Sequence, residues 1–186
     1  MSIRRKLTNN NNVYFCTVTC ANWLPLFEIA KLYDHIYEWF DYLNKIDMKT
    51  IGFVIMPNHL HVLLYLQGIE LNINKIIGNC KRFMAYEVVK RLTEMNMHEL
   101  LNDLADSVQE SDIAKGKKHN VFEPSFDAKI IVSQKFMVQK LNYIHQNPVR
   151  GKWKLVNDYR EYEHSSAGFY ESNNYNGYKV THYMEL

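Results

Sequence analysis

Two short apolar runs separated by a turn signal constrain the fold of this chain most. The runs IGFVI and VLLYL are rich in β-branched and aromatic side chains, which favour strands. Between them, residues 56–61 read MPNHLH, and Pro57 followed by Asn58 is a turn signal. The pattern therefore predicts two neighbouring strands, over about 50–56 and 59–66, joined by a tight turn.

Two histidines open the second of these strands. Residues two apart in a strand point to the same face, so His59 and His61 should present their imidazoles side by side next to the turn. Such a pair can hold a metal ion or a phosphate group on a rigid element. The apolar Leu60 between them fits a strand that buries its other face. Two polar positions on a half-exposed strand would show the same spacing.

A second motif, YIHQNP, occupies residues 143–148 and closes a helical pattern. Ser133 is a good N-cap for this helix, and Pro148 disfavours helical geometry in the residue before it. Tyr143 and Asn147 are four residues apart and share one helical face. A tyrosine and an amide at the end of a helix could meet the two histidines, although a tyrosine in such a turn is usually a packing residue.

The remaining pattern alternates between strands and helices. We expect a strand at 13–20, helices at 28–46 and 72–93, a strand at 129–132 and a helix at 133–147. The β-α-β-β-α-β order is typical of a ferredoxin-like or RRM-like sandwich, an α+β fold whose antiparallel sheet carries helices on one face. We expect one domain over 1–186, with a partly helical, flexible insertion at 96–120 and a C-terminal extension at 154–186.

Composition excludes some classes of protein. Hydrophobic residues make up 47% of the chain, but no apolar run approaches the ~20 residues needed to span a membrane. The basic residues near the N-terminus are not followed by an apolar segment, which argues against a secretory signal. Three cysteines without metal-site spacing indicate reduced thiols in a cytoplasmic protein. The net charge of +2 neither demands nor excludes nucleic acid as a partner.

The two motifs in this order, with Ser165 and Ser166 downstream, resemble the single-tyrosine HUH transposases over roughly residues 10–170. The similarity is greatest to the branch of REP-associated tyrosine transposases. This resemblance implies cleavage of single-stranded or hairpin DNA through a 5′-phosphotyrosine, with Tyr143 as the nucleophile.

The resemblance also implies a metal centre and a cellular setting. His59, His61 and Asn147 would hold a divalent cation, Mg²⁺ or Mn²⁺, which polarises the phosphate that the phenol attacks. Imidazole ligands by themselves lean towards Zn, Cu, Fe or Ni. The protein would be cytoplasmic and associated with the nucleoid, and relatives act either as homodimers or as monomers.

Several cations are candidates for contacts with DNA phosphates. We select Lys81, Arg82, Arg150, Lys152 and Lys154, and note a further cluster at Lys115, Lys117 and Lys118. The segment from 150 to 154 follows the proposed nucleophile and contains Trp153, which could stack on a base or pack in the core.

Two other functions compete with the transposase interpretation. A non-catalytic protein derived from a transposase would bind hairpin or single-stranded DNA without cutting it. A histidine-based phosphohydrolase or nucleotide transferase would use the same His-x-His spacing. Such enzymes usually continue the alternation with another histidine or add a threonine, whereas position 63 is a leucine. We therefore rank this last alternative lowest.

Overall fold

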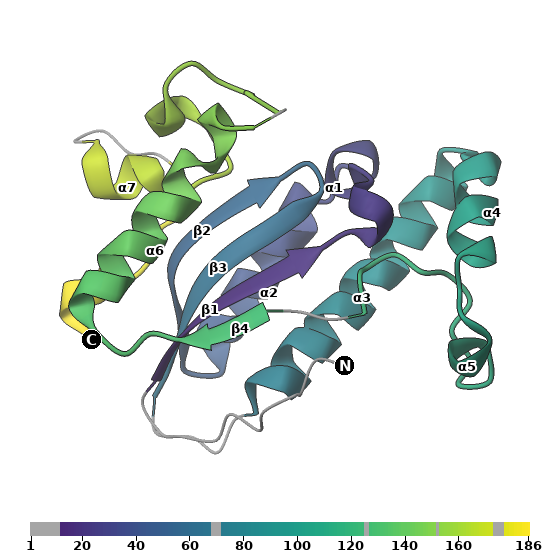
Figure 1. Ribbon diagram of the computed structural model, residues 1–186, viewed down its shortest axis with the longest axis horizontal. Coiled ribbons are helices and arrows are strands. Elements are labelled where there is room, and N and C mark those ends of the chain that lie inside the picture. Colours follow the sequence, from purple (N-terminus) through teal and green to yellow (C-terminus); the bar gives the residue numbers. More distant parts are fainter. Residues whose placement is uncertain (1–11, 68–71, 125–126, 152, 173–176) are drawn as a thin grey trace.

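The described residues build a four-stranded antiparallel sheet. The computed structural model describes residues 12–67, 72–124, 127–151, 153–172 and 177–186. The strands are β1 (Asn12–Thr19), β2 (Met48–Met56), β3 (His59–Leu66) and β4 (Asp127–Ile130), in the spatial order β2-β3-β1-β4 (Figure 1). All three pairings are antiparallel. The predicted fold class is therefore confirmed, including the hairpin formed by β2 and β3.

The helices cover both faces of the sheet, which corrects one detail of the prediction. Helices α2 (Tyr33–Lys45) and α3 (Ile73–Glu94) pack on one face, whereas α6 (Gln134–Gln146) packs on the other (Figure 1). We expected all helices on one face. The strands explain the difference, because β2 and β3 are apolar at successive positions and are buried on both sides.

Two separate cores follow from this arrangement. Alternate side chains of β3 enter different clusters: Leu60 and Val62 pack with α2 and α3, and Leu63 packs with α6. By the same alternation, His59 and His61 lie on the α6 face of the sheet. The face that carries the histidine pair is thus the face against which the second motif packs.

The predicted helix at 28–46 is broken in the structure. It forms a short α1 (Leu26–Ile29) and the longer α2, and Lys31 between them has a left-handed φ of 50°. The N–H of Leu32 donates to the carbonyl of Phe27 at 2.8 Å and closes this turn. The fourth strand also begins and ends two residues earlier than predicted.

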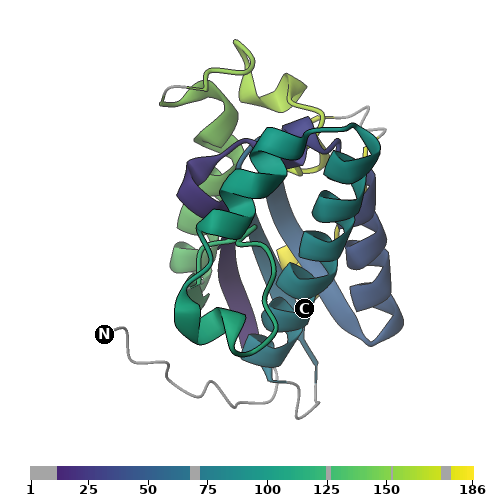
Figure 2. The same ribbon diagram turned by 90° about the vertical axis from the view of Figure 1, so that its right-hand side faces the viewer.

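Residues 96–120 are partly helical, as their sequence predicts. They contain α4 (His98–Asp106) and α5 (Glu110–Ile113), and α4 packs beside α3 (Figure 2). Leu104 is buried, and its carbonyl accepts a hydrogen bond from the N–H of Asn120 at 2.7 Å. The flexibility of this segment stays a prediction.

The C-terminal residues close the outer edge of β2. The N–H of Ile55 donates to the carbonyl of His164 at 2.8 Å, and the N–H of Thr181 donates to the carbonyl of Thr50 at 2.9 Å. The elements after α6 are η2 (Asn147–Val149), η3 (Tyr159–Glu161), α7 (Ala167–Glu171) and η4 (Tyr183–Glu185). Such pairing protects an edge strand from association with other chains. None of the described helices is both long and apolar enough to cross a membrane.

Candidate active site

The turn between β2 and β3 fixes the two histidines at the start of β3. In the sheet, His59 is paired with Thr19 of β1 and His61 with Thr17. The two imidazole rings lie edge to face with their centroids 4.7 Å apart. Both side chains are buried, and Asn58 in the turn is completely buried. The predicted side-by-side placement of the imidazoles is confirmed.

Helix α6 brings the second motif to the histidines. The ring of Tyr143 lies 5.2 Å from that of His61, centroid to centroid, and its side chain is 45% exposed. Asn147 donates from Nδ2 to the carbonyl of Tyr143 at 2.8 Å, and its side chain lies close enough to His59 to influence the pKa of that ring. Four residues from two distant segments thus meet on one face of the sheet. Their chemical roles stay predictions.

Hydrogen bonds orient both imidazoles. Nδ1 of His59 lies 2.7 Å from Oδ1 of Asn58, whose Nδ2 donates to the carbonyl of Trp23 at 3.2 Å. Oδ1 of Asn58 is therefore the acceptor, and Nε2 of His59 carries the lone pair. Nδ1 of His61 lies 2.9 Å from Oγ1 of Thr17. When Nδ1 of each ring is engaged in this way, Nε2 is the nitrogen that can ligate a metal.

Burial keeps both rings neutral near pH 7. It lowers the pKa of His59 to about 4, against a smaller opposing effect of the nearby Asn147 side chain. Burial also lowers the pKa of His61 well below its usual value, and the charges of His59 and Lys140 add to this effect. A neutral imidazole can bind a cation without first releasing a proton.

The donor set fits a divalent cation with mixed ligands. Two neutral imidazoles and the amide of Asn147 supply nitrogen and oxygen donors, and the side chain of Tyr143 beside them is half-exposed. Among the residues that the structure describes, no group of three or more His, Cys, Asp or Glu side chains could hold a metal ion. The choice of Mg²⁺ or Mn²⁺ stays a prediction, since amide and water oxygen ligands suit either ion.

Two further residues border the site and were not selected from the sequence. Nζ of Lys140 lies 4.4 Å from the ring centroid of Phe15 and 5.4 Å from that of Tyr143. Trp23 is 57% exposed and contacts the ring of His59 edge to face, with 5.9 Å between centroids. The i, i+3 spacing from Lys140 to Tyr143 was a usable signal for the lysine. Nothing in the sequence places Trp23 beside His59.

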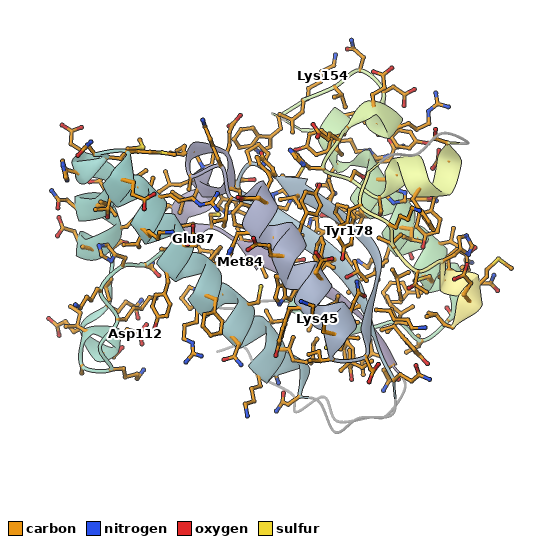
Figure 3. The ribbon with its side chains drawn as sticks, turned by 180° about the vertical axis from the view of Figure 1, so that it is seen from behind. Lys45, Met84, Glu87, Asp112, Lys154 and Tyr178 are labelled. Atoms are coloured by element: carbon orange, nitrogen blue, oxygen red, sulfur yellow. The ribbon has the colours of Figure 1, made fainter. Side chains whose placement is uncertain are left out.

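The predicted DNA-binding residues fall into two groups. Arg150 and Lys154 are exposed beyond the C-terminal end of α6, where Lys154 projects from the loop (Figure 3), while Lys152 lies outside the described residues. Trp153 packs against the core on the α6 face, which supports its packing interpretation.

The second group lies on α3, across the sheet from α6. Lys81 donates to the backbone carbonyls of Glu123 and Pro124, and Arg82 lies over the ring of Phe83 with 4.8 Å from Cζ to the centroid. Neither residue faces the histidine pair. A role for these residues in binding DNA therefore requires a second surface.

Solved structures identify the fold. The sequence matches no family model, and the comparison with curated proteins finds no relative. The structure of the REP-associated tyrosine transposase bound to a REP hairpin is similar over 97% of this chain and 93% of that chain, with a TM-score of 0.58 and 18% identity. This chain has the fold of that transposase. The similarity extends over both motifs and the elements that carry them.

A second solved structure, of a Deinococcus radiodurans R1 protein described as a candidate transposase, gives a weaker match. It covers 78% of this chain and 97% of that chain at 16% identity, with a TM-score of 0.39. The similarity of fold therefore rests on the first structure.

Proposed function

We propose that this protein is a transposase-type DNA strand transferase that cuts single-stranded DNA next to a hairpin. The observation that carries the proposal is the convergence of His59, His61, Tyr143 and Asn147 on one face of the sheet. The fold it shares with a transposase solved with a REP hairpin supports the same conclusion. Hairpin DNA is accordingly the substrate that we infer.

The proposed reaction is one transesterification. The phenol oxygen of Tyr143 gives up its proton and attacks a backbone phosphorus, a new O–P bond forms, and the bond from phosphorus to the 3′ oxygen breaks. The strand is left with a free 3′ hydroxyl, which takes up a proton, and with its 5′ phosphate on Tyr143. A divalent cation bound by His59, His61 and Asn147 would polarise the phosphate oxygens. The 5′ polarity follows from the family resemblance.

The residues around the phenol have separate tasks in this proposal. The contact between α6 and the sheet holds Tyr143 beside His61, so the attacking oxygen is positioned before the DNA arrives. Lys140 places a positive charge near the Tyr143 ring, where it can attract the phosphate. Arg150 and Lys154 extend the positive charge beyond the end of α6 and can bind neighbouring phosphates.

The experiment is a test for a covalent adduct. The wild-type protein, incubated with a labelled hairpin oligonucleotide and Mn²⁺, should give a protein–DNA band that survives denaturing electrophoresis. Tyr143→Phe should give no such band, yet should stay folded and bind the oligonucleotide, because the hydroxyl of a half-exposed side chain contributes little to stability. Tyr42→Phe is the matched control, since Tyr42 is similarly exposed on α2, and it should form the adduct normally.

Mapping the adduct by peptide mass spectrometry decides between nearby tyrosines. Tyr159 and Tyr162 follow the same basic segment, but the hydroxyl of Tyr159 bonds to Glu171 at 2.5 Å and that of Tyr162 to the carbonyl of Ile55 at 2.8 Å. An adduct on either residue would overturn the assignment of Tyr143. Tight hairpin binding without any adduct would instead favour the non-catalytic DNA-binding alternative.

A further inference from the structure

A groove on the far side of the sheet from Tyr143 is lined by positive charge. It has a volume of about 910 Å³ and lies between α3 and the segment that follows α5. The α3 wall contributes Lys81, Arg82 and Lys90, and the facing wall contributes Lys115, Lys117 and Lys118. Figure 3 shows the two walls from behind, with Glu87 on α3 and Asp112 on α5.

The charge of the groove is only partly neutralised by the protein itself. Lys115 and Lys117 pair with Asp112, at 3.0 Å and 3.7 Å from nitrogen to oxygen. Arg82 and Lys118 are exposed and form no salt bridge with any described residue. These two cations, one on each wall, are the charges that a polyanion lying in the groove could reach.

Two exposed aromatic side chains of α3 lie in or next to this groove. Tyr86 lines the groove and is 65% exposed, and Phe83 one turn earlier on α3 is 54% exposed. Their rings lie edge to face, 6.4 Å apart between centroids, and Arg82 covers the Phe83 ring. Exposed aromatic rings beside cations suit unpaired bases, which stack on rings while their phosphates meet the charges. A double helix offers its phosphates but not its base faces.

One wall of the groove is joined to the candidate active site. The carbonyl of Val121 accepts from the N–H of Ala21 at 2.9 Å, and Oε1 of Glu123 accepts from the N–H of Asn22 at 2.8 Å. The next residue, Trp23, contacts His59. Lys81 fixes the same wall to α3 through the carbonyls of Glu123 and Pro124. A strand leaving the site over the exposed Trp23 ring therefore meets this wall next.

We propose that this groove binds the single-stranded DNA that flanks the hairpin, as a second DNA-binding surface separate from the site of cleavage. The proposal rests on the proposed function for the identity of the DNA. The residues of the groove itself indicate where the DNA binds and that it is single-stranded. The insertion at 96–120 supplies Lys115, Lys117 and Lys118 to one wall of this surface.

The test compares three labelled DNAs by fluorescence anisotropy: a hairpin with thymidine flanks on both sides, the same hairpin without flanks, and a blunt duplex. The test variant is Arg82→Gln combined with Lys118→Gln. Its matched control is Lys45→Gln combined with Lys179→Gln, which removes equal charge at exposed positions outside the groove. Circular dichroism checks that every variant is folded.

We expect the groove variant to bind the flanked hairpin more weakly, with a salt dependence reduced by about 1.4 in the slope of log affinity against log salt, since each lost single-strand phosphate contact removes about 0.7. Tyr86→Ala should weaken the same DNA by at least about fivefold through lost stacking. Neither change should affect the hairpin without flanks, and the control should match the wild type with all three DNAs.

Three results would overturn the proposal. They are equal salt slopes for the groove variant and its control, an equal loss on the hairpin without flanks, or an equal loss on the blunt duplex, which would assign the groove to paired DNA. The adduct assay remains independent of these measurements. If Tyr143 forms no adduct but the groove variant still binds the flanked hairpin more weakly, the proposed cleavage is wrong and the proposed DNA-binding groove is supported.

Discussion

The surroundings of His59 and His61, more than their spacing, make the two imidazoles suitable as metal ligands. Burial lowers the pKa of both rings, and Asn58 and Thr17 engage the Nδ1 atoms. Partners of this kind fix the orientation of a ligating imidazole and raise its basicity. The two side chains would therefore lose little rotational freedom on binding a cation, which would favour binding to the folded protein.

At this scale we predict the effect of removing each imidazole. His59→Ala and His61→Ala should each abolish adduct formation and greatly weaken Mn²⁺ binding, because one ligand and its fixed geometry are lost. Hairpin binding should be largely retained, because it depends on phosphate contacts elsewhere. Isothermal titration calorimetry with Mn²⁺ and anisotropy with the hairpin measure the two properties separately.

His98→Ala serves as the control for these variants, since His98 is exposed at the start of α4. It should leave Mn²⁺ affinity and adduct formation unchanged. Undiminished Mn²⁺ affinity in both His59→Ala and His61→Ala would contradict the assignment of the metal site. Adduct formation that survives removal of divalent cations by EDTA would contradict the metal requirement itself.

At the level of elements, the position of α6 decides whether Tyr143 reaches the histidines. The helix lies directly on Gly52 of β2, where an added Cβ would stand 2.5 Å from Cδ2 of Leu141. His145 is buried, and its Nε2 lies 2.9 Å from Oγ of Ser166, which also accepts from the N–H of Phe53 at 2.9 Å. These contacts fix the distance of α6 from the sheet and its rotation about the helix axis.

Gly52→Ala should therefore destabilise the protein and displace α6. We expect a loss of about 1–3 kcal/mol in the free energy of unfolding, as for other overpacked cores, together with slower adduct formation. Gly78→Ala is the control, because nothing lies within 4 Å of its added Cβ on α3. It should stabilise the helix by about 0.5–1 kcal/mol. Urea unfolding of both variants measures this, and unchanged stability in Gly52→Ala would refute the close packing of α6.

Local patterns predicted the elements better than their packing. The β2–β3 hairpin and the pair His59 and His61 followed from strand alternation, and Tyr143 with Asn147 followed from helical spacing. The break at Lys31 did not, because a single left-handed residue leaves the apolar spacing intact. The face that α6 covers was also missed, because periodicity shows that a helix has an apolar side but not which surface that side meets.

The partners of the site were hidden for a similar reason. Thr17 reaches His61 only through the register of β1 against β3, and the sequence does not specify which residues of two strands stand opposite. The groove between α3 and the segment after α5 depends on how an insertion folds back onto a helix. Lys118 and Arg82 could be recognised as cations from the sequence, but not as lining the same groove.

For the whole molecule, buried neutral histidines link stability to pH. The pKa of His145 is lowered to about 4 by burial, and those of His59, His61 and His164 are also lowered, in each case mainly by burial. In the unfolded chain these groups titrate near 6.5. Between about pH 6.5 and 4 the unfolded state therefore binds more protons than the folded state.

We predict that the contribution of these histidines to the free energy of unfolding is constant above about pH 6.5. It should decrease as the pH falls from 6.5 towards 4. Urea unfolding in EDTA, repeated across this range, measures the slope without competition from bound metal. His145→Gln should reduce the slope by up to about 1.4 kcal/mol per pH unit, because one proton fewer is taken up on unfolding. If His145→Gln retained the wild-type slope, His145 would have to titrate alike in the folded and unfolded chain, which its burial against Ser166 should prevent.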